Sequence, residues 1–281
     1  MTLGTLLKQG REILQNAGIA EWDLDAWYLL EYVTGVSRSQ YFLDPEREVP
    51  QEQEVLYRQM IDKRSTHIPL QHLTGEQEFM GLTFKVNEHV LIPRQDTEVL
   101  VEECLRHLAP GNIFLDLCTG SGCILVSLLH YAKGTFGTGA DLSGKALSVA
   151  KGNVEANGVE ARLVQGDLFE PVTGTFDLIV SNPPYIASAE IETLTPEVRE
   201  HEPRMALDGT ADGLFFYKRI VQESPSYLKE GGWLCMEIGY DQGAVVQQLM
   251  EARGFVTVSV IKDLAGLDRV VSGCYRRNRN V

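Results

Sequence analysis

The sequence predicts an α/β protein: a Rossmann-like parallel sheet with a terminal antiparallel hairpin, preceded by a small all-helical domain. Two observations carry this prediction. From residue 112 onward, short apolar runs typical of buried strands alternate with helical patterns, as in βαβ units. Near the C-terminus, the strand-like runs 255–261 and 270–275 are joined by 262–269, which shows no helical pattern. A connection this short favours antiparallel pairing.

The helical domain is expected over residues 1–80. Its first helix follows Thr2, the expected N-cap, and two further helices are expected over 21–33 and about 51–63. The apolar residues at helical spacing in the first of these are Leu3, Leu6, Leu7, Ile13 and Leu14. This domain carries no glycine-rich loop and no cluster of catalytic residue types, so we assign it to packing or to partner recognition.

A β-hairpin connector is expected over residues 81–96. The run 81–86 alternates as a strand does, and the run 90–93 is its expected partner. A polar stretch follows, in which Asp96 or Thr97 is expected to cap a helix. That helix opens the remaining domain.

The remaining domain, residues 97–281, carries the alternation. Besides the two C-terminal runs, strands are expected at 113–117, 137–142, 161–164, 176–180 and 233–238. Helices are expected after residue 122, over 145–156 and over about 242–253. This order predicts a parallel sheet whose strands end along one edge.

Composition argues against several classes of protein. No apolar run approaches the ~20 residues that span a bilayer, and the N-terminus lacks a signal-peptide pattern. We therefore expect a cytoplasmic protein without a membrane anchor, and a monomer. The formal net charge of −14 argues against a broad phosphate-binding surface, so no direct nucleic-acid binding is expected. The five cysteines form no C-x-x-C pair, which predicts reduced thiols and no metal site.

A glycine-containing loop, D-L-C-T-G-S-G at 116–122, closes the first strand of this domain and opens a helix. Its glycines let the backbone approach a ligand, and the helix N-terminus offers free N–H groups. The third glycine of a dinucleotide fingerprint is missing, and no Walker G-K-[ST] follows. Taken alone, the loop fits a tight turn and a ligand site equally well. Its candidate ligand-binding residues are Cys118, Thr119, Gly120, Ser121 and Gly122.

Two aspartates follow the next two strands. Asp141 could accept hydrogen bonds from a ribose diol, and Asp167 from the exocyclic amine of a purine. Each alone is most often a turn former or a cap. With the glycine loop, however, they lie at the carboxyl ends of three successive strands, where open α/β sheets bind ligands. The sequence therefore predicts a nucleoside ligand along this edge.

The segment S-N-P-P-Y-I, residues 181–186, ends the next strand, because proline cannot donate to a strand ladder. Pro183 and Pro184 stiffen a turn that presents the amide of Asn182 and the ring of Tyr185. An isolated N-P-P-Y fits a rigid turn. Beside the glycine loop and two aspartates, it indicates a site that holds a planar group.

The glycine loop, both aspartates and N-P-P-Y together resemble a class I S-adenosylmethionine-dependent methyltransferase. N-P-P-Y narrows the resemblance to enzymes that methylate an amide or an exocyclic base amine. Most of the chain is similar to one branch, the release factor glutamine methyltransferase family, long called HemK or PrmC. The further matching segments are P-L-Q-H-L-T-G at 69–75, F-M-G-L at 79–82, L-I-P-R-Q-D-T-E at 91–98, A-L-D-G at 206–209 and D-L-A-G at 263–266.

The resemblance implies methyl transfer from S-adenosyl-L-methionine, with S-adenosyl-L-homocysteine as product. The implied acceptor is the side-chain amide nitrogen of the glutamine in the Gly-Gly-Gln loop of class 1 peptide chain release factors. Our hypothesis that residues 1–80 recognise that partner rests on their separate, site-free character. The implied site residues are Asn182, Pro183 and Tyr185 for catalysis; Asn182, Pro183, Pro184 and Tyr185 for the substrate; and Cys118, Thr119, Gly120, Ser121, Gly122, Asp141, Asp167, Leu168 and Asn182 for the cofactor.

Three residues depart from the family pattern. Cys118 stands where a glycine is usual, Leu168 where an aromatic residue often flanks the adenine, and Gln95 where proline is common. We expect none of them to abolish activity, and we expect Leu168 to weaken cofactor binding.

Two other functions stay open. An N6-adenine methyltransferase acting on DNA or RNA would hold the base amine in the same turn, but it needs a flipped base and a basic surface. A binding module that kept the fold and lost the chemistry is the third hypothesis, and the intact N-P-P-Y argues against it.

Overall fold

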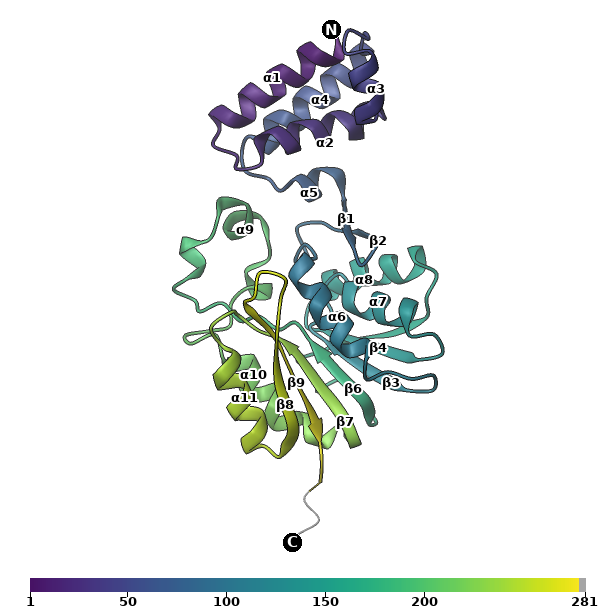
Figure 1. Cartoon of the computed structure of the whole chain (residues 1–281), viewed down its shortest axis with the longest axis vertical. Helices are drawn as coiled ribbons and strands as arrows, with labels where there is room; N and C mark the ends of the chain where they lie inside the picture. Colours follow the sequence, from purple (N-terminus) through teal and green to yellow (C-terminus); the bar gives the residue numbers. More distant parts are fainter. Residues whose placement is uncertain (278–281) are drawn as a thin grey trace. The chain divides into compact units, whose positions relative to one another are not determined.

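The computed structural model describes residues 1–277, which form two compact units (Figure 1). The first unit comprises Met1–Glu76 together with Thr195–His201. The second comprises Gln77–Leu194 and the described residues from Glu202 onward. Within residues 1–277, no helix is long and apolar enough to cross a membrane.

The first unit is a helical bundle. Its helices are α1 (Leu3–Asn16), α2 (Trp22–Thr34), α3 (Arg38–Leu43), α4 (Gln51–Arg64), α5 (Leu70–Thr74) and α9 (Pro196–His201). The three helices expected from the sequence are α1, α2 and α4, which pack around one apolar cluster (Figure 1). Thr2 caps α1 as predicted, since its hydroxyl accepts a hydrogen bond from the amide of Thr5 at 3.4 Å. The short helices α3, α5 and α9 were not predicted.

A close approach of α1 and α4 shapes the bundle core. A Cβ atom at Gly10 would lie 2.1 Å from the hydroxyl oxygen of Tyr57, so only glycine fits there. Tyr57 is fully buried and its hydroxyl donates to the carbonyl of Ala26 at 3.1 Å. The buried Arg64 donates to Asp25 at 2.7 Å and to Glu197 at 3.0 Å, which ties the segment Thr195–His201 into this unit.

The hairpin at the start of the second unit differs from the expected one. The predicted strand at 81–86 is present as β2 (Leu82–Lys85), but it pairs with β1 (Glu76–Phe79), and residues 90–93 form no strand. Met80 and Gly81 between the strands have φ of 52° and 68°. Two consecutive positive φ values are what a tight hairpin turn requires, and they set the pairing.

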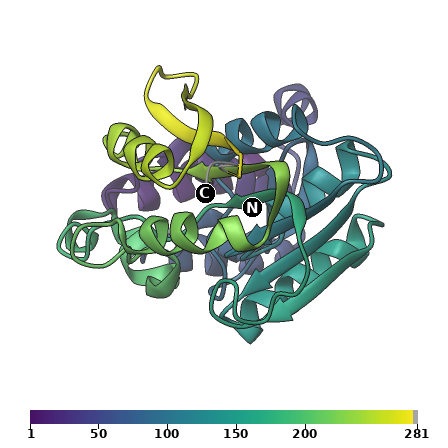
Figure 2. The ribbon, with the colours of Figure 1, turned by 90° about the horizontal axis from the view of Figure 1, so that it is seen from below.

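A seven-stranded sheet forms the middle layer of the second unit, in the order β5-β4-β3-β6-β7-β9-β8. The strands are β3 (Ile113–Leu117), β4 (Phe136–Asp141), β5 (Ala161–Gln165), β6 (Phe176–Ser181), β7 (Leu228–Glu237), β8 (Phe255–Lys262) and β9 (Asp268–Tyr275). The first five are parallel, and β9 is antiparallel to both of its neighbours, which confirms the predicted terminal hairpin. Figure 2 shows that hairpin at one edge and β4 and β5 at the opposite edge.

Helices cover both faces of this sheet. On one face, α6 (Glu98–Leu105), α7 (Cys123–Tyr131) and α8 (Gly144–Ala156) pack on the cluster that contains Phe114 and Leu178. On the other, α10 (Phe215–Glu223) and α11 (Gly243–Ala252) pack on the cluster that contains Leu115 and Ile179. Of these, α10 was not predicted. Single turns of 3-10 helix lie at Gln95–Thr97 (η1), Ile191–Thr193 (η2), Arg204–Ala206 (η3) and Ser224–Ser226 (η4).

The strand order indicates where along the sheet a ligand would bind. From β3 the chain adds β4 and β5 on one side, and then crosses to add β6 and β7 on the other. Such a reversal leaves a crevice at the carboxyl ends of the two strands where it occurs, here β3 and β6. The loops that follow these strands are the glycine loop and N-P-P-Y.

Candidate functional site

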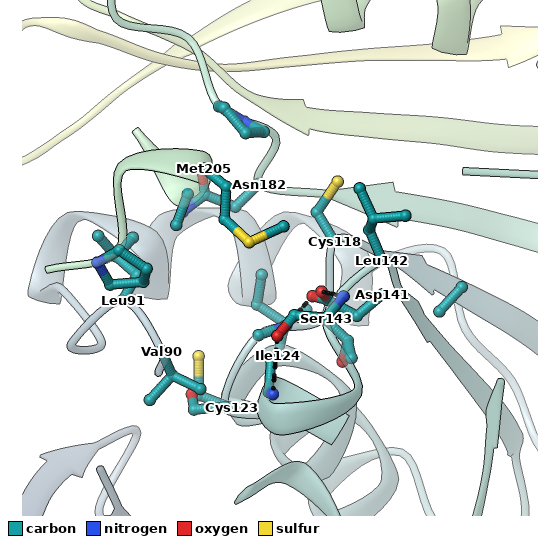
Figure 3. Close-up of a pocket in the computed structure, with 18 of the residues that line it drawn as sticks. Val90, Leu91, Cys118, Cys123, Ile124, Asp141, Leu142, Ser143, Asn182 and Met205 are labelled. Atoms are coloured by element: carbon teal, nitrogen blue, oxygen red, sulfur yellow. Dashed lines mark hydrogen bonds between the residues drawn. The ribbon is translucent and has the colours of Figure 1, made fainter. Parts of the chain in front are cut away.

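A cavity opens at the carboxyl ends of strands β3 to β6 (Figure 3). It encloses about 980 Å³, a volume that includes open solvent at its mouth, so a ligand of nucleoside size fits. The predicted site residues that line it are Cys118, Thr119, Gly120, Ser121, Asp141, Asp167, Leu168, Asn182 and Pro184. Gly122, Pro183 and Tyr185 lie next to these residues in the chain but not on the cavity wall.

The glycine loop turns sharply before α7. Cys118, Gly120 and Gly122 have φ of 60°, 54° and 78°, in the left-handed region. Gly122 serves packing, because a Cβ atom there would lie 3.2 Å from the Cβ of Ala150 on α8. Cys118 is strained, since a residue with a Cβ atom pays about 1–2 kcal/mol in this conformation. A glycine at this position would relieve that strain.

Asp141 is held by the backbone on both sides of its carboxylate. Its Oδ2 accepts from the amide of Gly120 and its Oδ1 from the amide of Ser143, both at 2.8 Å (Figure 3). Burial raises the pKa of Asp141, and these backbone hydrogen bonds oppose the rise. Each carboxylate oxygen has a second lone pair, so Asp141 can still accept from a ligand in the cavity.

Asp167 already has a protein partner. The Nη1 of Arg219, on α10, lies 3.0 Å and 2.8 Å from its two carboxylate oxygens. No sequence pattern pointed to this pair, because α10 itself was not expected. Next to it, Leu168 is 5% exposed and has a φ of 48°, a second strained position among the predicted cofactor residues. The role predicted for Asp167 stays a prediction.

The N-P-P-Y turn is anchored from two sides. Asn182 donates from Nδ2 to the hydroxyl oxygen of Thr97 at 3.4 Å, and Tyr185 donates from its hydroxyl to Oε1 of Glu237 at 3.4 Å. Thr97 holds the N-cap position of α6, as predicted, but its hydroxyl makes no capping hydrogen bond. The prediction of a side-chain cap there is wrong, and the hydroxyl contacts the turn instead. Burial raises the pKa of the Tyr185 phenol far above its usual value.

Close backbone contacts hold the same turn. Gln242 donates from Nε2 to the carbonyl of Tyr185 at 2.9 Å. A Cβ atom at Gly209 would lie 2.8 Å from the Cα of Tyr185 and 2.9 Å from the carbonyl oxygen of Pro184. The A-L-D-G segment at 206–209 therefore packs directly against N-P-P-Y.

Several residues of the cavity wall were not predicted as site residues. Those from the segment before α6 are His89, Val90, Leu91, Pro93, Arg94 and Thr97, and those from the region around η3 include Pro203 and Met205. Figure 3 shows Val90 and Leu91 across the cavity from Asp141, with Met205 beside Asn182. The segment 91–98 of the resemblance held the signal for Leu91, Pro93, Arg94 and Thr97, and none of the matching segments contains the other four. Arg94 is paired at 2.5 Å with the buried carboxylate of Glu202.

A metal site does not emerge from the described residues, 1–277. Among them, no three His, Cys, Asp or Glu side chains gather as a metal ion would require. The cysteines are free thiols, and burial raises the pKa of both Cys118 and Cys123.

Comparisons with known proteins extend this description. The family described as "PrmC N-terminal domain" matches residues 5–75, and the family described as "Methyltransferase small domain" matches residues 95–200. The release factor glutamine methyltransferase of Geobacter sulfurreducens is 41% identical over 273 residues, which are 97% of this chain and 96% of that protein. The one from Caulobacter vibrioides is 42% identical over 282 residues, with 97% of both chains covered.

Solved structures show the fold. A methyltransferase from Pyrococcus furiosus has a TM-score of 0.55 at 18% identity, and the match covers 70% of this chain and 91% of that chain. The hMettl16 catalytic domain has a TM-score of 0.57 at 18% identity, covering 82% and 84%. The second unit therefore has the class I methyltransferase fold, as predicted.

Proposed function

Because the chain belongs to the release factor glutamine methyltransferase family, we propose that it methylates the glutamine in the Gly-Gly-Gln loop of class 1 peptide chain release factors. The methyl group goes from S-adenosyl-L-methionine to the side-chain amide nitrogen, and S-adenosyl-L-homocysteine is the product. One observation carries the proposal. The N-P-P-Y turn reaches the wall of a cavity of nucleoside size, with Asn182 on that wall.

The cavity residues fit this cofactor. Gly120 brings its backbone to the wall with a conformation that favours glycine, and Asp141 presents a fixed carboxylate there. We assign the ribose hydroxyls to Asp141, the adenine to Asp167 and Leu168, and the methionine part to the glycine loop. When bound, the cofactor supplies an electrophilic methyl group on a sulfonium.

The turn prepares the acceptor nitrogen. An amide nitrogen is a poor nucleophile because its lone pair is delocalised into the carbonyl. We propose that Asn182 Oδ1 and the Pro183 carbonyl accept hydrogen bonds from the two N–H groups of the substrate amide. Tyr185 then lies against the planar amide. The two prolines fix the direction of the carbonyl, which preorganises acceptors toward the positive charge that develops on the nitrogen.

Alignment is then the main source of acceleration. Well-oriented reacting groups contribute up to about 7–11 kcal/mol. No strong general base is needed, since the proton can leave the nitrogen after transfer. Until the proton leaves, Asn182 and Pro183 hold the nitrogen in place by accepting hydrogen bonds from its N–H groups.

The helical unit is the proposed site of partner recognition. It is compact by itself, it matches a family of its own, and it exposes Phe42 and Leu43 to 77% and 86%. Our proposal further includes a monomeric enzyme that acts in the cytoplasm without binding nucleic acid directly. The net charge of −14 supports the last point.

Methyl transfer from labelled S-adenosylmethionine tests the proposal against the adenine alternative. The protein is incubated with a recombinant class 1 release factor, with the same factor carrying alanine in place of the Gly-Gly-Gln glutamine, and with an adenine-containing DNA or RNA. We expect label in the unaltered factor alone. Label in the nucleic acid, or equal label in both factors, contradicts the proposal.

A further inference from the structure

Glu237 is a buried carboxylate behind the N-P-P-Y turn, and the reaction above gives it no task. It ends β7 and is 2% exposed. Its Oε1 accepts from the Tyr185 hydroxyl at 3.4 Å, while its Oε2 has no partner at hydrogen-bond length among the described residues. A buried carboxylate with spare acceptor capacity costs stability, so its position beside the turn calls for a function.

Thr97 connects this carboxylate with Asn182. Its hydroxyl lies 3.4 Å from Asn182 Nδ2. It also faces Glu237 closely enough to lower the pKa of that carboxylate, although the two groups lie beyond hydrogen-bond length in this structure. The contact of Thr97 with Asn182 and that of Tyr185 with Glu237 are both long, at 3.4 Å.

The direction of the Thr97 proton decides which end of the Asn182 amide meets the substrate. A threonine hydroxyl has one proton to donate, and an ionised glutamate can only accept. If the Thr97 proton points to Glu237, the hydroxyl oxygen accepts from Asn182 Nδ2, and Asn182 Oδ1 is left for the cavity. If the proton points to Asn182 instead, the amide reverses and presents a donor where the substrate N–H needs an acceptor.

We propose that Glu237 is a positioning residue for methyl transfer: through Thr97 it fixes the Asn182 amide with its oxygen toward the substrate, and it anchors the Tyr185 hydroxyl at the same time. This inference rests on the proposed function. It identifies the groups that orient Asn182, the residue proposed to accept a hydrogen bond from the substrate amide.

The charge on Glu237 links this arrangement to pH. The charged or titratable groups that face it are Asp96 from η1, Tyr185, Tyr217 from α10, Arg269 from β9 and Cys123 from α7. Burial raises the pKa of Glu237 to about 7, and Thr97, Arg269 and Tyr185 oppose the rise. Below that pH the protonated carboxyl can itself donate to Thr97, which frees Asn182 to reverse. Turnover should therefore fall as the pH is lowered through about 7.

Paired variants of Thr97 give the sharpest test. Thr97→Val keeps the shape and removes the hydroxyl, whereas Thr97→Ser keeps the hydroxyl. We expect Thr97→Val to lower kcat about 10- to 100-fold, the size of one hydrogen bond to a charged group. Thr97→Ser should restore most of that loss, with little change in the Kd for the cofactor. Equal kcat values for the Val and Ser variants would overturn the inference.

Glu237→Gln tests the charge. It should lower kcat to a similar extent and remove the fall in turnover below about pH 7. The double variant with Thr97→Val should be no slower than either single variant, because both act through one chain of contacts. Glu103→Gln is the matched control, since Glu103 is also buried and accepts from the hydroxyl of Ser272 at 2.8 Å, away from the cavity wall. Additive losses in the double variant would contradict the inference.

A second readout needs no turnover. The NMR signals of the Asn182 side-chain amide, assigned with Asn182→Asp, should shift with pH around 7 in the unaltered protein and stay constant in Glu237→Gln. A wild type that shows this shift without methylating release factors overturns the proposed function alone. A wild type that methylates them, with an Asn182 signal insensitive to Glu237, overturns the positioning role alone.

Discussion

Asn182 shows how much of the proposed chemistry depends on single residues. Its neighbours Pro183 and Pro184 are stiff, its amide is tied to Thr97, and it lies on the wall of the cavity. The sequence could predict Asn182, because the N-P-P-Y turn is local. It could not predict Thr97, which lies 85 residues earlier in the chain, or Glu237, a single acidic residue at a strand end. Contacts between distant residues leave no local pattern.

Asn182→Ala should remove most of the methyl transfer. Loss of one oriented acceptor at the reacting nitrogen is expected to lower kcat about 10²- to 10³-fold, the usual cost of one preorganised hydrogen-bonding group. The cofactor Kd, measured by calorimetry, should stay largely intact. If cofactor affinity falls as much as turnover, Asn182 holds the cofactor and not the acceptor amide.

Cys118 offers a test of backbone strain. Both Cys118→Ala and Cys118→Gly remove the thiol, but only glycine relaxes the φ of 60°. Relief of about 1–2 kcal/mol of strain is partly offset by the greater backbone entropy of glycine, about 0.5–1 kcal/mol. The glycine variant should thus be the more stable of the two by roughly 0.5–1 kcal/mol in urea unfolding. An alanine variant as stable as the glycine variant would show that the loop carries no such strain.

At the scale of elements, hydrophobic patterning predicts well and turn chemistry less so. The strands of the sheet and the helices α7, α8 and α11 follow from alternating apolar runs and helical spacing. The β1–β2 hairpin was misplaced because Met80-Gly81 lacks the usual asparagine or aspartate before glycine. The helix α10 was missed, and with it Arg219, the partner of Asp167. The carboxyl ends of the sheet strands were predicted to within one residue, which is why most predicted residues line one cavity.

Substitution by alanine should have opposite effects on stability at two helical glycines. Gly10→Ala forces a Cβ atom into the hydroxyl of Tyr57, and such overpacking costs about 1–3 kcal/mol. A Cβ atom at Gly152 in α8 would meet nothing within 4 Å beyond the backbone of its own helix, so Gly152→Ala should gain up to about 1 kcal/mol from helix propensity. Thermal unfolding of both variants measures the difference. A Gly10→Ala variant as stable as Gly152→Ala would mean that α1 and α4 are not closely packed.

At the scale of the whole molecule, two compact units divide the proposed work. The catalytic unit holds the cavity and the N-P-P-Y turn, and the helical unit carries exposed apolar side chains without a cavity residue. From the sequence, we expected a separate helical domain because the first 80 residues lack catalytic motifs, and its role stays a prediction. The sequence could not predict that Thr195–His201 belongs with the helices, because that depends on the contact of Glu197 with Arg64.

Substitution of the exposed pair on α3 tests partner recognition. Phe42→Ser combined with Leu43→Ser should raise the KM for the release factor about tenfold or more, given about 1.5–3 kcal/mol for each large apolar side chain that a complex buries. Turnover at saturation and the cofactor Kd should not change. Phe136→Ser is the control, since Phe136 is 63% exposed at the opposite end of β4 from the cavity. An unchanged KM in the double variant argues against this face as the docking site.

Mass spectrometry of a recombinant class 1 release factor, after incubation with this protein and S-adenosylmethionine, tests the central claim most directly. Fragmentation of the peptide that contains the Gly-Gly-Gln loop locates the methyl group. The account predicts one added methyl on the side-chain amide of that glutamine, with Asn182→Ala as the inactive control. A factor that stays unmodified while the cofactor binds, or a methyl group on another residue, would contradict it.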